Sequence, residues 1–188
     1  GFMQTLHFQH PEAGQNVDRS KVDEAVGFTM EDYRVIGFFF DPSHAKADDQ
    51  TDDDRFWWPL VDAWHERYHR KLKLWPIKTG TGRHSVAFDM LKPSSQQRFQ
   101  PAVMQLAEDL KEGVALHHGG DRLRQHMKNA RRREGRYGTT LGKEHRSSAR
   151  KVDLAVCAVG ARMMRREWLL ANKASTGTPG KGRVIVPK

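Results

Sequence analysis

The feature of this sequence that most restricts its fold is a short, unbroken apolar run. Val35-Ile36-Gly37-Phe38-Phe39-Phe40 is bounded by Arg34 before it and by Asp41-Pro42 after it. A strand that other elements cover on both faces has such a continuous run, whereas a strand with one wet face alternates. The run therefore predicts a central strand of an α/β fold. Asp41 then lies at its carboxyl end, where open α/β sheets place their sites.

Segments of helical periodicity alternate with further short apolar runs along the chain. We expect helices over residues 20–30, 55–70, 93–111, 122–133 and from 148 onward. We expect an edge strand over 4–9, short strands over 72–77 and 114–117, the latter buried, and a strand or hairpin arm over 137–143. This order favours one α/β domain over residues 1–171 with a mixed sheet flanked by helices, followed by a flexible basic tail at 172–188.

Polar residues mark the expected starts of these helices. Ser20-Lys21-Val22-Asp23 has the form of a capping box with Asp in the place of Glu. Asp121 can cap the helix that follows it, and Ser147 or Ser148 can cap the last helix. The acidic run at 48–54 lacks the central Gly and closing Glu of a calcium loop, so we expect a solvated lead into helix 55–70.

The last helix carries the residue that fits its surroundings least. Asp153 lies between Val152 and Leu154, close to an apolar stripe at helical spacing. An ionised carboxylate in such a place is costly unless it caps, pairs or binds a metal. An Asp in the first turn is also favoured by the helix dipole, so the residues alone leave the dipole and the metal interpretations open.

Asp41 and Asp153 together suggest one kind of chemistry. Carboxylates that converge at the ends of elements can hold two Mg²⁺ or Mn²⁺ ions about 4 Å apart, which activate water and stabilise charge on a scissile phosphate. An HNH-like metal site is the alternative, built from histidines and Asn129. The side chains for it are His117, His118, His126 and His145. Because His126 falls on the apolar face of its helix, a core or DNA-facing role is favoured for it, and the single Cys157 disfavours zinc.

The charge of the chain points to a polyanionic partner. The formal net charge is +9 and the sequence pI is about 9.9, which favours nucleic acid. Cations concentrate between residues 122 and 151, and those best placed to hold a phosphate backbone are Arg131, Arg132, Arg133, Arg136 and Lys143. The alternative is a merely solvated basic face. The Gly-rich basic loop at 78–84 can also touch phosphates, although the chain contains no P-loop. No apolar run reaches the roughly 18 to 20 residues of a membrane span, so no membrane partner is expected.

Several of these features, taken in order, resemble a known family. The series is similar to the end of the nuclease domain of tailed-phage terminase large subunits, particularly those of actinobacterial phages. Its parts are His117-His118-Gly119-Gly120-Asp121, Leu123, His126, Asn129-Ala130, 138–143 and 151–156. The segments 22–26 and 35–42, followed by Trp57-Trp58, resemble the middle of the same domain. The resemblance covers roughly residues 5–168.

The resemblance implies an RNase H-like fold and a two-metal endonuclease that cuts concatemeric double-stranded viral DNA, with Mg²⁺ or Mn²⁺ as cofactor. Asp41 matches the second acid of the family and Asp153 the last, while Lys143, His118 and Asp121 match positions near the site. The family's first acid lies on a strand that should precede Leu6, and its ATPase domain is also missing from this sequence. We therefore expect the C-terminal portion of a terminase, which cleaves poorly on its own.

In the complete protein, the resemblance implies an ATPase domain, a terminase small subunit and a portal as partners, in the host cytoplasm. The single Cys157 suits that reducing compartment. Two other functions stay open at this point: a non-enzymatic DNA-binding module that uses only the basic cluster, and a related RNase H-like resolvase that prefers branched DNA.

Overall fold

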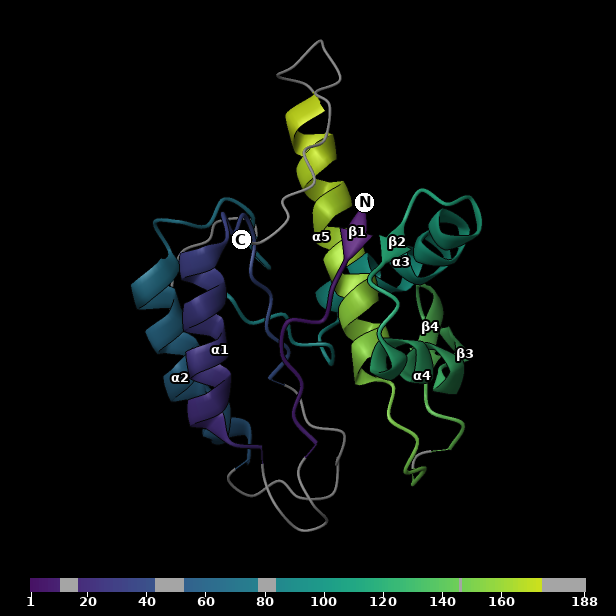
Figure 1. Cartoon of the computed structure of the whole chain (residues 1–188), viewed down its shortest axis with the longest axis horizontal. Helices are drawn as coiled ribbons and strands as arrows, with labels where there is room; N and C mark the ends of the chain where they lie inside the picture. Colours follow the sequence, from purple (N-terminus) through teal and green to yellow (C-terminus); the bar gives the residue numbers. More distant parts are fainter. Residues whose placement is uncertain (11–16, 43–52, 78–83, 146, 174–188) are drawn as a thin grey trace.

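The extended segment at 35–41 runs through the middle of the protein, as the apolar run predicts. The structure is a computed structural model and describes residues 1–10, 17–42, 53–77, 84–145 and 147–173 (Figure 1). Gly37 forms a parallel bridge with Leu74, and Phe40 forms one with Ala87. Phe40 donates its backbone N–H to the carbonyl of Val86 at 2.9 Å. The segment thus has two parallel neighbours, each joined to it by a single bridge rather than by a long ladder.

The two faces of this segment cover two separate cores. Phe38 and Phe40 pack against Trp64 in a core that also takes in helices α1 (Arg19–Asp32) and α2 (Asp53–Tyr68). Phe39 points to the other core, where its ring lies 5.3 Å from that of Phe88. Helices α3 (Pro93–Lys111) and α5 (Asp153–Lys173) belong to this second core and lie on the opposite side of the molecule from α1 and α2 (Figure 1). We call the two the α1–α2 core and the α3–α5 core.

Two small paired elements complete the α3–α5 side. Strand β1 (Phe2–Met3) pairs in parallel with β2 (Leu116–His117). Helix α4 (Asp121–Asn129) follows β2, and then β3 (Arg131–Gly135) and β4 (Gly138–Gly142) form an antiparallel hairpin. The turn of the hairpin is tied to α3, because Gln100 Oε1 accepts the backbone N–H of Tyr137 at 2.6 Å. A Cβ on Gly135 would lie 2.5 Å from that same oxygen, so this contact requires glycine.

The mixed α/β class is confirmed, but three expected elements differ. The edge strand expected at 4–9 is wrong, since the paired residues are Phe2 and Met3. Helix 122–133 ends at Asn129, because Ala130 is extended and β3 pairs with β4. Both residues of β2 are exposed rather than buried. Among the described residues, β1 is the strand that pairs with β2, and Ala115, just before β2, is the residue of this segment that is buried in the core.

Three of the expected helix starts are also wrong. Asp18 rather than Ser20 caps α1, and its carboxylate accepts the backbone N–H groups of Ser20 and Lys21. Helix α4 begins at Asp121 itself, with Gly120 as its cap. Helix α5 begins at Asp153 rather than near Ser148, because the Ser148 hydroxyl accepts the Arg150 N–H in a preceding turn.

At its other end α5 continues to Lys173, so the first two residues of the expected tail are helical. The remainder of that tail (174–188), the loop at 78–83 and most of the acidic run (48–52) lie outside the described residues. Within the described ranges, no helix has both the length and the apolar character needed to cross a membrane.

Candidate active site at the start of helix α5

Asp41 lies where the sequence predicts, at the end of the central segment. It follows Phe40, the last residue of that segment to bridge a neighbour, and it is exposed. Its Oδ1 accepts the backbone N–H of Met90 at 3.2 Å. This hydrogen bond ties the carboxylate to the chain that follows the neighbouring bridge at Ala87.

Asp153 is the first residue of α5 and is itself exposed. The residues on either side of it, Val152 and Leu154, are buried in the protein. Burial of its neighbours fixes the backbone here while the carboxylate remains accessible. This position also lets the carboxylate interact favourably with the helix dipole, so the dipole and metal interpretations are compatible at this residue.

Asp41 and Asp153 share one neighbour, Cys157. Cys157 lies one turn after Asp153 on α5 and is exposed. Although part of the residue faces solvent, the protein around the sulfur desolvates the thiolate and raises the pKa of the thiol, and the negative charges of Asp153 and Asp41 raise that pKa further. Two carboxylates from distant parts of the chain therefore act on the same thiol. The sequence places Cys157 one turn after Asp153, but it does not predict that Cys157 also has Asp41 as a neighbour.

Two buried polar side chains of α4 contact the same end of α5. His126 Nδ1 accepts the backbone N–H of Leu154 at 3.1 Å, and Asn129 Nδ2 donates to the carbonyl of Lys151 at 2.9 Å. Burial lowers the pKa of His126, an effect that the Asp153 carboxylate opposes. The core role favoured for His126 is thus confirmed, because its ring packs inside the protein.

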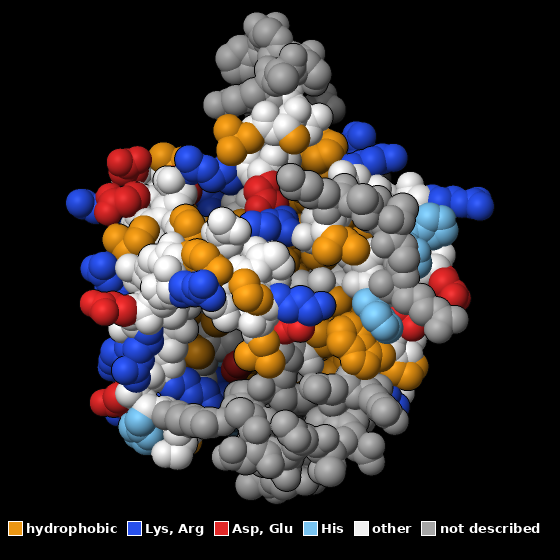
Figure 2. Space-filling view, turned by 180° about the vertical axis from the view of Figure 1, so that it is seen from behind, with side chains coloured by type: hydrophobic (Ala, Val, Ile, Leu, Met, Phe, Trp, Pro, Cys, Tyr) orange, Lys and Arg blue, Asp and Glu red, His pale blue; other side chains and the backbone are white. Residues whose placement is uncertain are grey.

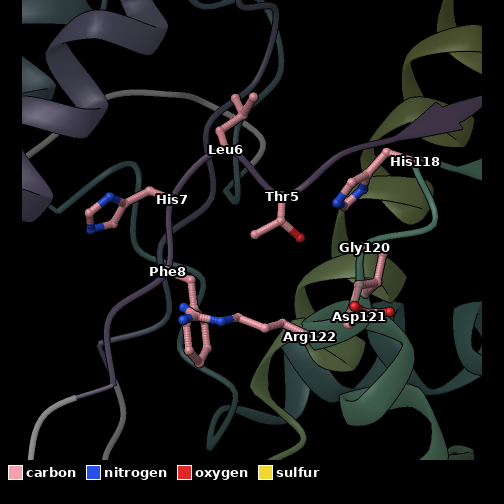
Figure 3. A pocket seen from close by; sticks show the side chains of 9 residues that line it. Thr5, Leu6, His7, Phe8, His118, Gly120, Asp121 and Arg122 are labelled. Atoms are coloured by element: carbon pink, nitrogen blue, oxygen red, sulfur yellow. The ribbon is translucent and has the colours of Figure 1, made fainter.

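A pocket of about 310 Å³ opens beside this contact, between the N-terminal segment and the start of α4 (Figure 3). Its lining includes His118 and Asp121, which sequence reasoning placed near the site. The Arg122 guanidinium lies 4.9 Å from the centre of the Phe8 ring on one wall. Phe8 also meets the ring of His126 edge-on at 5.4 Å, so the pocket wall is continuous with the packing around Asp153.

The predicted basic cluster is divided between surface and structural roles. The residues Arg131, Arg132, Arg133 and Arg136 are all exposed on or beside β3, and Lys143 is half-buried. Arg133 donates to the carbonyls of Lys143 and Glu144, and Arg131 donates to those of Lys128 and Ala130. Arg136 lies over the ring of Tyr137 at 5.6 Å. In Figure 2, Lys and Arg side chains occupy the left edge of the molecule, interleaved with Asp and Glu.

The donor set suits a hard divalent cation better than a soft one. Asp41 and Asp153 offer carboxylate oxygens, which Mg²⁺ and Mn²⁺ prefer. In the part of the chain that the structure describes, no three His, Cys, Asp or Glu side chains are grouped as a metal site. Two carboxylates alone are fewer ligands than a pair of ions would need.

Comparisons with known proteins place similar sequences in bacteriophages. The chain is 34% identical, over 165 residues, to the Gene 13 protein of Mycobacterium phage D29, and 33% identical over the same length to the Gene 13 protein of Mycobacterium phage L5. Each match covers 87% of this chain and 25% of the relative. The chain thus spans about a quarter of the length of the curated relatives that it matches. No family model matches the chain, and no solved structure gives a significant match.

Proposed function

We propose that this chain is part of the nuclease domain of a phage terminase large subunit, a metal-dependent endonuclease with an RNase H-like fold that cleaves double-stranded DNA. The observation that carries the proposal is that Asp41 and Asp153, from distant parts of the chain, both raise the pKa of the Cys157 thiol. One carboxylate comes from the end of a central extended segment and the other from the first turn of a core helix. The phage origin of the relatives, and the match to only 25% of the length of each, support a segment of a large packaging protein.

In this proposal, different residues bind the metal, hold the DNA and support the site. Asp41 and Asp153 hold Mg²⁺ or Mn²⁺, which when bound supplies water activation and charge neutralisation at the phosphate. Arg132 and Arg136 hold the DNA backbone from the hairpin, without reading base sequence. Lys143 and His118 lie on the approaches to the site, and Asp121 supports the first turn of α4. The complete protein works in the host cytoplasm, with an ATPase domain, a small subunit and a portal.

The test is a plasmid-nicking assay with Mn²⁺ on the complete protein. Asp41→Ala and Asp153→Ala should each reduce cleavage at least ~100-fold, more than the loss of an outer-sphere partner of a metal site. Glu24→Gln is the control, because Glu24 is an exposed acid of α1, on the opposite side of the molecule from α5. Wild-type cleavage by both alanine variants would contradict the assignment. Preference for branched over linear DNA would indicate a resolvase instead.

A second function, a non-enzymatic DNA-binding module, is favoured by one observation. The described residues contain no group of three metal-ligating side chains, whereas the exposed arginines of the hairpin can bind phosphates without any further group. Such a module would bind DNA with steep salt dependence, would need no divalent ion and would not respond to Asp153→Asn. Binding and cleavage measured on the same variants separate the two functions.

A further inference from the structure

Two buried polar side chains bracket Asp153 from a neighbouring helix. His126 is 6% exposed and Asn129 is 8% exposed, and both lie on the inner face of α4. Buried polar groups are costly unless they find partners. Both find them on the backbone at the start of α5: His126 at the N–H of Leu154 and Asn129 at the carbonyl of Lys151. We call this pair the α4 clamp.

The α4 clamp provides a hydrogen-bond acceptor for the backbone at the start of α5. The first N–H groups of a helix have no partner within the helix, and a Ser or Asp side chain just before it normally accepts one of them. The Ser148 hydroxyl instead accepts the N–H of Arg150. His126 takes the place of a local cap, since its Nδ1 accepts the Leu154 N–H and must therefore be unprotonated.

Each member of the clamp is itself held in orientation. Gln125 Nε2 donates to Asn129 Oδ1 at 3.0 Å, which leaves the Asn129 amide N–H groups directed at Lys151. Phe8 packs edge-on against the His126 ring. A side chain whose rotamer is fixed by such contacts transmits its own position to the backbone that it binds.

We propose that His126 and Asn129 are positioning residues that fix the backbone on both sides of Asp153 and thereby aim its carboxylate at the metal. The metal part of this inference rests on the proposed function, whereas the backbone part does not. The two bonds anchor residues 151 and 154, so the chain between them has little freedom to rotate. Groups that hold a reacting centre must keep their geometry within about 0.5 Å, which a helix start without a cap does not provide.

The experiment uses two substitutions of His126 that separate its acceptor from its ring. His126→Phe keeps a ring against Phe8 but has no acceptor, and His126→Asn keeps an acceptor close to the position of Nδ1 but loses the ring. Amide hydrogen exchange at Leu154, relative to that at Val159 further along α5, should rise about tenfold in His126→Phe and stay near wild type in His126→Asn. Mn²⁺ affinity, measured by calorimetry on the full chain, should weaken about tenfold or more in His126→Phe and recover in His126→Asn.

Leu123→Ala is the control for general destabilisation. Leu123 is buried on the same helix, and its apolar side chain makes no hydrogen bond, so its truncation should raise exchange at Leu154 and Val159 alike. Asn129→Leu removes the bond to Lys151 but keeps the acceptor for Leu154, so it should weaken Mn²⁺ affinity with a smaller rise in Leu154 exchange than in His126→Phe. The clamp is overturned if Leu154 exchange in His126→Phe rises no more than Val159 exchange does.

The metal part has its own decisive outcomes. If Asp153→Asn weakens Mn²⁺ binding but His126→Phe does not, the aiming role of the clamp is wrong. If Asp153→Asn leaves Mn²⁺ binding unchanged, the proposed function and the metal part fail together. The exchange ratio alone then decides whether the clamp holds the backbone.

Discussion

At the scale of single residues, Asp153 shows why a carboxylate at the start of a helix is ambiguous in sequence. The helix dipole alone stabilises such a charge by about 0.3–1 kcal/mol, enough to select an Asp without any ligand. What distinguishes the metal interpretation is the second carboxylate. Asp41 and Asp153 both act on Cys157, and a dipole-stabilised Asp has no need of such a partner.

The shared neighbour gives a test that does not depend on catalysis. Cys157 is the single cysteine of the chain and is exposed, so its alkylation by iodoacetamide is read directly by mass spectrometry. Because the two carboxylates raise the pKa of the thiol, Asp41→Asn and Asp153→Asn should each lower that pKa and speed alkylation at pH 8. The double variant should react fastest. Glu24→Gln, at an exposed acid of α1, serves as the control, and equal rates in all variants would show that the two carboxylates do not act on Cys157.

A buried ion pair between α3 and α5 makes a second residue-scale prediction, on stability. Arg162 Nε donates to Asp109 Oδ2 at 2.6 Å, and both side chains are about nine-tenths buried. Asp109→Asn leaves the Arg162 charge buried without its counter-ion, so the free energy of unfolding at pH 7 should fall by about 3 kcal/mol. Glu108→Gln, an exposed neighbour on the same helix, should change it little.

The pH dependence of this difference follows from the direction of the pKa shift. The hydrogen bond from Arg162 lowers the pKa of Asp109 below its ordinary 3.8. The carboxylate therefore adds stability that is complete above pH 3.8 and disappears as the pH falls through the lower folded pKa. Urea unfolding at pH 7, 5 and 3 should show the gap between wild type and Asp109→Asn narrowing only at the lowest pH. A constant gap would contradict the role of the ion pair.

At the scale of elements, the sequence predicts helices much better than it predicts their caps or their strands. Helix α3 has the predicted bounds, because a long periodic stretch begins at Pro93, and proline is favoured in the first turn. The cap of α5 was not predictable, since its acceptor is a histidine 28 residues earlier in the chain. Half of the hairpin was predicted. Gly138–Gly142 is a strand as expected, but the sequence predicted the arginine-rich segment opposite it as the end of a helix.

The hairpin allows its arginines to be separated by role. Arg132 and Arg136 are exposed, and Arg132→Ala and Arg136→Ala should each weaken duplex DNA binding and reduce the salt slope by about 1. Arg133 binds two carbonyls across the hairpin, so Arg133→Ala should also speed amide exchange in β4. Fluorescence anisotropy over a salt series measures the slopes. Arg70→Ala, an exposed cation next to α2, is the control, and an equal effect from it would indicate only non-specific charge.

At the scale of the whole molecule, the apolar run at 35–40 predicted the central segment but not its neighbours. Its partners, Leu74 and Ala87, bridge it at single positions, and such long-range contacts leave no period in the sequence. For the same reason the sequence did not predict that Asp41 and Asp153 would share Cys157 as a neighbour. The alternation within the run is nevertheless informative in retrospect, because Phe39 and Phe40 enter different cores.

That alternation predicts that the two cores unfold together. One stretch of backbone contributes Phe39 to the α3–α5 core and Phe40 to the α1–α2 core. Unfolding of either core therefore destabilises the other. Leu106→Ala truncates a buried residue of the α3–α5 core and should lower the free energy of unfolding by about 2–5 kcal/mol. In a Trp168→Phe background, tryptophan fluorescence reports the other core, from Trp57, Trp58, Trp64 and Trp75. The fluorescence and circular dichroism transitions should shift together in Leu106→Ala and remain coincident.

Leu91→Ala, the control at a position 69% exposed, should shift neither transition. A fluorescence transition that stays at its wild-type midpoint while the circular dichroism transition moves would show two independent folding units, and the central segment would then not couple the two cores.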